Sequence, residues 1–315
     1  KLVLNPSVRF DHYRYTMPDT GAMAGETLTQ SAVDPRLSAS YDVHAQVRLK
    51  ASLGIHSGPS RFSFAEPPIV FGPIPAFEGA GLQYGLQRSR QVQAGVETRI
   101  GQELEFNLTA FFHTSDIPID FSLLDKELLA DTSPCDGDSS AGFTMPFDIK
   151  GRSYGAEMLL RRRLGSSVFG WLSYAVSRSE RDIPRVGVLP FDFDQTHVFN
   201  GVVSWELGRN WTLGGVLHVN SGRPYTPFTV DQCSGYYDAR RGEPNSARLP
   251  NYWRLDLRVQ KREVFDTWFF DFYIDFFNAA FQFETIDYEV NDFSGEIDPV
   301  TVPLFVPMIG IRGEF

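Results

Sequence analysis

Apolar and polar residues alternate with a period of two along most of this chain. In the stretch 253–260, WRLDLRVQ, every odd position is apolar and every even position is charged or polar. The stretches 47–56 and 104–113 alternate in a similar way. Because successive side chains of a β-strand point to opposite faces of a sheet, this period predicts strands with one apolar and one polar face.

The pattern predicts twelve strands joined by alternately short and long connections. The strands span roughly 2–14, 35–43, 46–57, 82–100, 103–115, 147–164, 167–180, 193–207, 211–222, 250–262, 267–281 and 303–315. The long connections fall near 15–34, 58–81, 116–146, 181–192, 223–249 and 282–302. Antiparallel strands bring all of these to one end. Long external loops opposite short periplasmic turns are typical of an outer-membrane barrel.

Composition agrees with this interpretation. The mean hydropathy is -0.21, and no stretch approaches the roughly 18 consecutive apolar residues of a membrane-spanning helix. A barrel that is apolar outside and polar inside averages to such a value. Trp205, Trp211 and Trp268 lie beside short turns, as in an aromatic girdle. We therefore predict an all-β fold, an antiparallel transmembrane β-barrel, with a single domain over residues 1–315.

Several functions are disfavoured by the sequence. The net charge of -10 argues against nucleic acid as a partner, because phosphate binding needs a basic surface. The six histidines show no metal-ligand spacing, and no nucleophile elbow or phosphate-binding glycine loop is present. Ser204 and His218 on neighbouring strands both fall on the polar face, away from lipid. We expect no enzyme activity, no cofactor and no metal site.

Charged residues recur on the face predicted to line the lumen. By alternation this face carries Glu157, Arg161, Arg163, Arg254, Asp256, Arg258, Asp271 and Asp275. One interpretation is a polar wall that holds a plug or passes a hydrophilic solute. The other is mutual satisfaction of these charges by salt bridges inside the barrel. Both interpretations can hold together.

The long loops carry the remaining candidate chemistry. The segments 116–146 and 282–302 are strongly acidic, which suits Ca²⁺ or a cationic solute, or simply solvated loop charge. The loop 223–249 instead combines arginines with tyrosines, a mixture suited to an anionic or aromatic ligand such as a metal chelate. Its candidate ligand-binding residues are Arg223, Tyr225, Tyr236, Tyr237, Arg240 and Arg241.

The two cysteines, Cys135 and Cys233, both fall in long loops. In an oxidising compartment a disulfide between these loops is one interpretation, and two unpaired thiols are the other.

Five runs in order resemble the C-terminal barrel half of TonB-dependent outer-membrane receptors. They are SYGAEMLLRRRL (153–164), HVFNGVVSWELGRNWTLGGVLHVNSGRPYTPF (197–228), LPNYWRLDLRVQKR (249–262), DFYIDFFNAAF (271–281) and IGIRGEF (309–315), and PRLSASYD (35–42) extends the match upstream. The run DFFNAAF lacks the polar residue that more usually precedes the Phe-Asn pair. The resemblance implies the last twelve strands of a twenty-two-stranded barrel.

The resemblance also implies location and partners. It places the chain in the outer membrane of a Gram-negative bacterium, among outer-membrane lipid and lipopolysaccharide. It implies insertion by the outer-membrane assembly machinery, which reads a closing aromatic residue such as Phe315. It further implies a TonB-type energy transducer or a separate barrel or plug segment as a partner. No plug domain is visible in this chain, so a plug would have to come from such a separate segment.

Two functional hypotheses follow. The first is a TonB-dependent receptor whose barrel takes up a solute such as a metal chelate. The alternative is a non-transporting barrel that anchors or scaffolds a protein complex at the outer membrane. Whether the twelve strands close alone or belong to a larger barrel stays open at this stage.

Overall fold

The computed structural model describes residues 1–16, 27–59, 85–119, 147–162, 167–184, 186–233 and 235–314. The regular structure within these residues consists of β-strands. Among them, no helix is long and apolar enough to cross a membrane.

Twelve long strands form one antiparallel sheet, as the alternation predicts. They are β1 (Leu2–Thr16), β2 (Thr27–His44), β3 (Val47–Pro59), β4 (Leu86–Ile100), β5 (Leu104–Ile119), β6 (Phe147–Arg162), β7 (Val168–Ile183), β9 (His197–Gly208), β10 (Trp211–Asn220), β15 (Tyr252–Val264), β16 (Phe269–Phe277) and β19 (Val306–Glu314). Each pairs with the next in this order, and the short β8 (Gly187–Pro190) pairs with β7.

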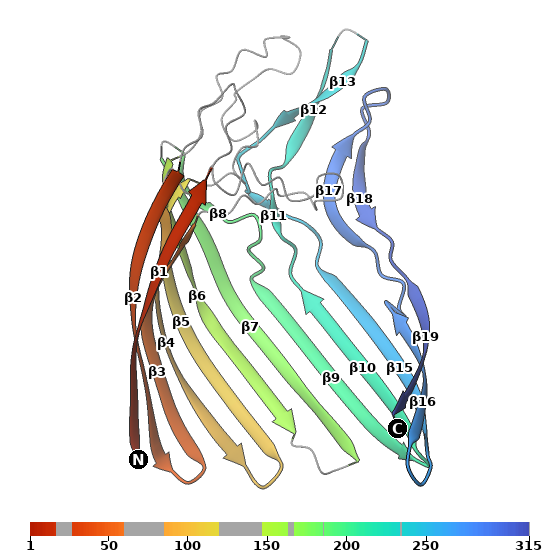
Figure 1. Ribbon diagram of the computed structural model, residues 1–315. Helices are drawn as coiled ribbons and strands as arrows, with labels where there is room; N and C mark the ends of the chain where they lie inside the picture. Colours follow the sequence, from red (N-terminus) through yellow and green to blue (C-terminus); the bar gives the residue numbers. More distant parts are fainter. Residues whose placement is uncertain are drawn as a thin grey trace.

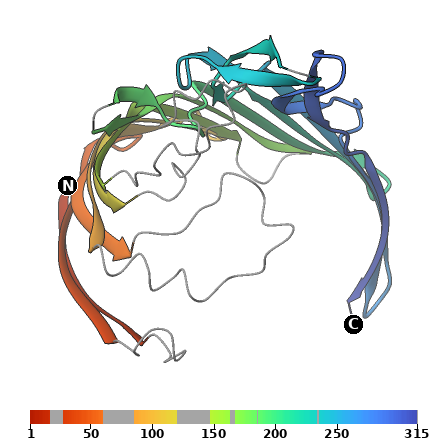
Figure 2. The same cartoon turned by 90° about the horizontal axis from the view of Figure 1, so that it is seen from above.

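The sheet curves into most of a barrel but does not close on itself (Figure 2). Strands β1 and β19 lie at its two ends and do not pair with each other within the described part of the chain. Short turns lie at the end that carries both termini, and the longer connections lie at the opposite end (Figure 1). We call these the turn end and the loop end. This arrangement confirms the predicted asymmetry.

The register places apolar residues side by side across the sheet. One row of directly opposed residues crosses ten strands and comprises Leu2, Tyr41, Leu49, Val96, Leu108, Met158, Tyr174, Phe199, Val219 and Trp253. This face is uncovered, with Ile309 72% and Ile311 67% exposed. A continuous exposed apolar face is costly in water and favourable against lipid. We call it the outer face.

Very little hydrophobic core exists inside the sheet. The buried apolar residues of the described chain are Ala32, Ile117, Ile149, Ile183 and Leu249. Ile117, Ile149 and Ile183 form one small cluster at the loop end, where Val186 and Leu189 pack against them. The sheet is therefore held mainly by its hydrogen-bond ladders and side-chain pairs rather than by a second layer.

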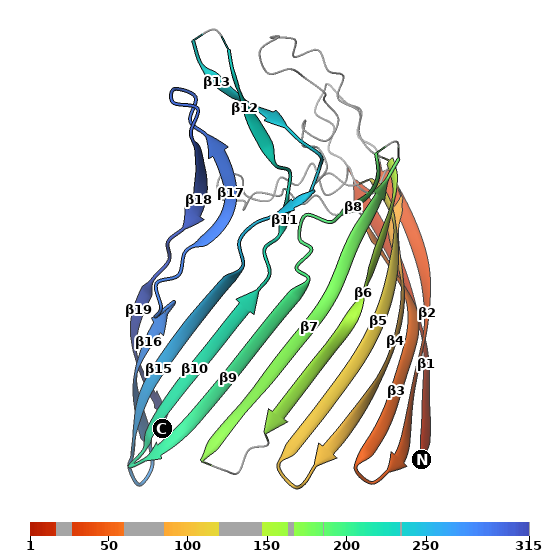
Figure 3. The same cartoon turned by 180° about the vertical axis from the view of Figure 1, so that it is seen from behind.

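Three segments predicted as long connections contain strands, namely 181–192, which contains β8, and two longer segments. The segment 223–249 forms β11 (Pro224–Tyr225), β12 (Phe228–Gln232), β13 (Tyr237–Arg241) and β14 (Ala247–Arg248), and the segment 282–302 forms β17 (Glu284–Val290) and β18 (Ile297–Val302). The pairs β12–β13 and β17–β18 project as hairpins from the loop end (Figure 3). Their turns contain Gly235 and Gly295, both at positive φ, which favours tight turns.

Strand β2 is also longer than expected. It begins at Thr27 rather than near residue 35, since Thr27–Asp34 pair with Arg9–Thr16 of β1. The stretch TLTQSAVD has weak alternation, so only its pairing with β1 defines it as strand.

Candidate functional site

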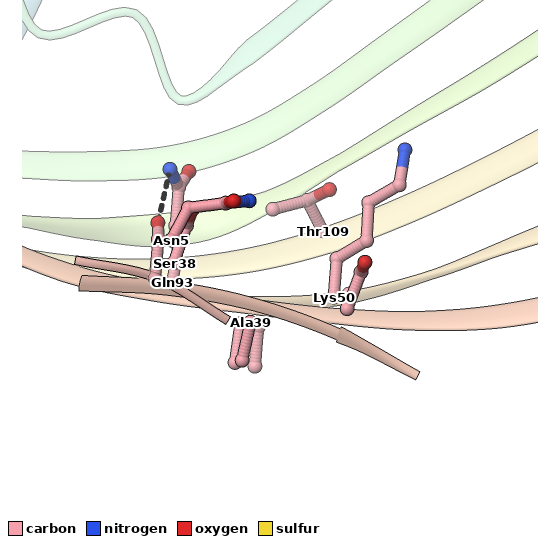
Figure 4. A pocket seen from close by; sticks show the side chains of 11 residues that line it. Asn5, Ser38, Ala39, Lys50, Gln93 and Thr109 are labelled. Carbon is pink, nitrogen blue, oxygen red and sulfur yellow. Dashed lines mark hydrogen bonds between the residues drawn. The ribbon is translucent and has the colours of Figure 1, made fainter. Parts of the chain in front are cut away.

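The face opposite the outer face is polar and forms the candidate site. Figure 4 shows Asn5, Gln93 and Thr109 on one side of the sheet and Ala39 on the other. The polar side chains point toward the other strands of the curved sheet, so this is its concave side. We call it the inner wall.

Strands β15 and β16 contribute the most charged part of the inner wall. Asp271 is 2% exposed and accepts two hydrogen bonds from Arg262, from Nε at 2.7 Å and from Nη2 at 2.8 Å. Arg258 lies opposite Asp275 and pairs with it at 3.2 Å. Arg254 pairs with Asp256 of its own strand at 3.1 Å. The predicted lumen charges on these strands are therefore engaged with one another.

Aromatic rings of β16 cover the same three arginines. Arg254 lies 4.1 Å from the ring centroid of Phe277, Arg258 3.9 Å from Tyr273, and Arg262 4.3 Å from Phe269. Stacking of a guanidinium on a ring face is favourable and restricts its orientation. We call this set of arginines, aspartates and rings the arginine ladder. It gives this part of the wall a fixed pattern of charge.

The ladder includes a residue that the sequence interpretation omitted. Arg262 lies on the same face as Arg254 and Arg258 because all three occupy even positions of β15. The alternation therefore contained the signal for Arg262, which falls within the predicted strand 250–262.

Further ion pairs cross the strands on the other side of the wall. Arg161 pairs with Glu105, which is 7% exposed. Lys50 pairs with Glu97 on the neighbouring strand. Glu157 lies opposite Thr109 on the inner wall and is exposed. Arg163 lies outside the described residues.

The inner wall formed by β1 to β5 has a shallow recess of about 310 Å³. Its lining comprises Asn5, Ser38, Ala39, Ser40, Lys50, Ala51, Ser52, Gln93, Ala94, Gly95 and Thr109. The Gln93 amide donates to Ser52 Oγ at 2.8 Å (Figure 4). Small side chains leave space here, and their hydroxyl and amide groups offer donors and acceptors to a hydrophilic surface or solute.

The residues predicted to bind a ligand fall into two groups at the loop end. Arg223 and Tyr225 lie at the base of the hairpins, where Tyr225 packs against Tyr288 with ring centroids 5.3 Å apart. Tyr236, Tyr237, Arg240 and Arg241 belong to the β12–β13 hairpin or its turn.

Several of these side chains already have protein partners. Arg240 pairs with Asp231 at 2.5 Å across the β12–β13 hairpin. The backbone N–H of Tyr237 donates to the carbonyl of Asp292 at 2.8 Å. A Cβ on Gly295 would lie 2.7 Å from the Tyr237 ring, so the two hairpins touch closely at this point. Tyr237 thus helps to join the two hairpins.

An ion pair between the buried Asp194 and the exposed Arg248, which the sequence did not indicate, holds the base of this region. Asp194 is 2% exposed; its carboxylate accepts from Arg248 Nη2 at 2.5 Å and from the backbone N–H of Ser179 at 2.6 Å. Arg248 also donates to the Gly222 carbonyl at 3.0 Å. A Cβ on Gly222 would lie 1.6 Å from the Leu249 carbonyl oxygen, so only glycine allows this approach.

The Phe-Asn pair in DFFNAAF has a structural explanation. Asn278 is 2% exposed and has a φ of 54°. Its amide donates to the carbonyls of Gln282 at 2.7 Å and Leu304 at 2.9 Å, and its carbonyl accepts from the Gln282 N–H at 3.1 Å. Asn278 therefore fixes where β16 ends and where the chain returns toward β19.

Other predicted features stay untested. Cys233 is disulfide-bonded, but Cys135 lies outside the described residues, so their pairing stays a prediction. Phe315 and most of the acidic loop 116–146 also lie outside. Among the described residues, no group of three or more His, Cys, Asp or Glu side chains is placed to hold a metal ion. His218 contacts Asn200 on the inner wall.

Comparisons with known proteins agree with this geometry. Residues 1–279 match the family model described as "TonB dependent receptor-like, beta-barrel". No curated protein sequence matches the chain significantly.

Solved structures of low sequence identity share the fold. The ferric citrate transporter FecA is 17% identical, with a TM-score of 0.64. The ferric-catecholate import receptor Fiu from E. coli K12 is 12% identical, with a TM-score of 0.63. The copper transporter OprC is 13% identical, with a TM-score of 0.60. The matches cover 99% of this chain but only 43%, 42% and 45% of the respective relatives. This chain therefore spans less than half the length of these relatives.

Proposed function

Because the chain belongs to the TonB-dependent receptor-like β-barrel family, we propose that it forms part of the barrel of an outer-membrane receptor that takes up a bulky hydrophilic solute. The observation that carries this proposal is the contrast between the two faces of one sheet. The outer face is apolar and uncovered, whereas the inner wall holds the arginine ladder and the polar recess. Such a sheet suits lipid on one side and a hydrated interior on the other.

The solute that we propose is a metal chelate. The similar structures include transporters of ferric citrate and of copper. At the loop end, Arg223, Tyr225, Tyr236, Tyr237, Arg240 and Arg241 supply cationic and aromatic groups suited to an anionic or aromatic chelate. We propose that these residues contact the ligand from two sides of the hairpin region, because the structure divides them between the hairpin base and the β12–β13 hairpin.

The inner wall supports a second part of the proposal. The charges of the arginine ladder are already paired and stacked, so they form a fixed surface rather than mobile groups waiting for a counter-ion. A fixed surface suits contact with a plug segment that fills the barrel. The proposed partners are therefore such a segment and a TonB-type energy transducer.

Uptake measurements on the full-length protein test this function. The gene would be deleted from a strain that lacks its other receptors, and uptake of labelled ferric citrate, a ferric catecholate and a copper complex would be compared with and without the gene and with and without the energy transducer. Uptake of at least one complex should require both.

The alternative is a scaffold that does not transport. Two results together would contradict the receptor proposal and favour the scaffold. Uptake of every complex would be the same with and without the gene, and a partner protein would co-purify in stoichiometric amount.

A further inference from the structure

A group of cations lies on the outer face where β4, β6 and β7 approach the loop end. On each strand the apolar residues of the outer face stop and basic residues follow. Val92 is followed by Arg90 and Arg88, Tyr154 by Arg152 and Lys150, and Val176 by Arg178. All five cations are exposed. We call Arg88, Arg90, Lys150, Arg152 and Arg178 the outer basic patch.

The register of the sheet brings these cations together. Arg90 lies opposite Thr114 of β5, and Thr114 lies opposite Arg152 of β6. Two strand spacings, about 10 Å, therefore separate the backbones of Arg90 and Arg152, with a hydroxyl between them. Arg88 and Lys150 flank Asp116 in the same way. Long side chains on either side of such a gap can reach one oxyanion group.

The patch has more cations than its carboxylates neutralise. Arg90 pairs with Asp116 at 2.7 Å. Arg152 and Arg178 share the single carboxylate of Glu180, which is 5% exposed.

Arg88 and Lys150 form no ion pair with any residue in the described part of the chain. Asp182, which lies opposite Lys150, and Asp148, two residues from Lys150 on β6, are the other carboxylates of this region, so its five cations face four carboxylates. The patch is thus positive in a chain with a net charge of -10.

The turn end of the same face has a different charge pattern. There Arg162 pairs with Glu103 at 2.7 Å, and Lys261 pairs with Glu263 at 3.0 Å. Each cation has its own carboxylate. The surplus of positive charge is therefore specific to the loop end.

We propose that the outer basic patch binds the phosphate groups of a phosphorylated glycolipid in the outer leaflet of the membrane. The inference rests on the proposed placement of the barrel in the outer membrane. There the outer face contacts acyl chains, so residues just beyond the apolar region lie at the level of the headgroups. Basic residues next to a membrane-spanning segment attract anionic headgroups, and guanidinium groups bind phosphate oxygens in a bidentate manner.

Lipid binding by matched variants tests the proposal. The full-length protein, purified from outer membranes in mild detergent and then delipidated, would be titrated with diphosphoryl lipid A and with its dephosphorylated form. The test variant is Arg88→Gln with Arg178→Gln, which leaves Arg152 to neutralise Glu180. The control is Arg162→Gln with Lys261→Gln, which removes two cations from the other end of the outer face.

The proposal predicts that the unaltered protein prefers the diphosphoryl form. Each cation removed from the patch should weaken binding about fivefold, hence about 25-fold for the test variant, from the usual contribution of a basic residue near an anionic surface. The control variant and the dephosphorylated lipid should show no such dependence. Solute uptake, measured in parallel, should be the same in the test variant and the unaltered protein.

Three results would overturn the proposal. They are equal losses in the test and control variants, equal binding of both lipid forms, and displacement of the lipid by inorganic phosphate alone, which would indicate a small-anion site. If the test variant fails to assemble, the proposal is tested on the unaltered protein alone. Tighter binding of the phosphorylated lipid would support it, and equal binding of both lipid forms would overturn it. Failure to find any solute uptake would count against the proposed function and leave the lipid measurement interpretable.

Discussion

Asn278 illustrates how one residue can fix the path of a chain. Its left-handed backbone conformation, with a φ of 54°, is tolerated by asparagine better than by most residues. Its amide group simultaneously satisfies the Gln282 and Leu304 carbonyls and the Gln282 N–H. The same residue therefore ends β16 and supplies hydrogen bonds that the irregular segment 278–283 cannot make by itself.

Replacement of this residue should destabilise the barrel. Asn278→Ala leaves buried polar groups without partners and places alanine at positive φ, so we expect a loss of about 1–3 kcal/mol in the free energy of unfolding. Asn278→Gly keeps the backbone conformation accessible and should lose less. Urea unfolding of the full-length protein in detergent measures both, with the exposed Asn5→Ala as control. Equal stability of Asn278→Ala and Asn5→Ala would contradict this role.

Gly310 shows a second local dependence between strands. A Cβ at this position would lie 2.1 Å from the Tyr273 ring, which itself lies under the Arg258 guanidinium at 3.9 Å. The ring therefore covers the glycine of β19 while stacking with an arginine of β15. Aromatic coverage of a strand glycine stabilises a sheet at a point where the strand lacks a side chain.

At the scale of elements, the charged side chains of the β15–β16 hairpin help to fix the register of its two strands. A shift of one residue would move Arg254, Arg258 and Arg262 to the outer face. The cost is about 2–4 kcal/mol for an arginine near the bilayer midplane and about 0–1 kcal/mol near the interface, where Arg262 lies. In the observed register each arginine instead meets an aspartate and an aromatic ring. The ladder thus opposes slippage of the hairpin.

Two ion pairs near the turn end should contribute differently to stability. In the Arg262–Asp271 pair the carboxylate is buried, whereas both members of the Arg312–Glu314 pair are exposed. Asp271→Asn weakens the bidentate hydrogen bonding with Arg262. Because Asp271 is buried, this change should lower the free energy of unfolding by about 1–3 kcal/mol. Glu314→Gln removes the partner of Arg312, but both of those side chains are at least 60% exposed, so its cost should not exceed about 1 kcal/mol. Chemical unfolding of the two variants makes the comparison. A larger effect of Glu314→Gln would contradict this ranking.

At the scale of the whole molecule, the two faces of the sheet define its surroundings. Few of the described residues form a core, and many large apolar side chains of the outer face are exposed. A soluble protein would bury such an apolar face in its core. In a membrane barrel, lipid covers this face instead. The face assignment therefore has direct consequences for assembly.

Two adjacent positions on β3 test the face assignment. Leu53 is 55% exposed on the outer face, and Ser52 lines the recess of the inner wall. Leu53→Arg places a charge in lipid and should lower the stability of the folded barrel by about 2–4 kcal/mol near the midplane. Ser52→Arg places its charge on the inner wall and should be tolerated. The fraction of heat-modifiable protein in isolated outer membranes reports assembly. If Ser52→Arg assembles less well than Leu53→Arg, the faces are assigned the wrong way round.

The sequence by itself predicts the sheet and its two faces. A period of two is a local property, and each strand displays it without reference to its neighbours. The number of long strands, the short turns opposite the longer connections and the family were therefore accessible. Trp253 to Gln260 indicated both the strand and the inward direction of its arginines, and continuing the same alternation would have added Arg262.

Only the tertiary structure decided which groups meet. Whether Arg248 reaches Asp194, or Tyr237 contacts Gly295, depends on the paths of segments 50 or more residues apart, and no local pattern encodes those distances. The outer basic patch likewise forms because cross-strand register aligns β4, β5 and β6. Side-chain direction follows from the strand alone, whereas partnership depends on register and on the packing of distant segments.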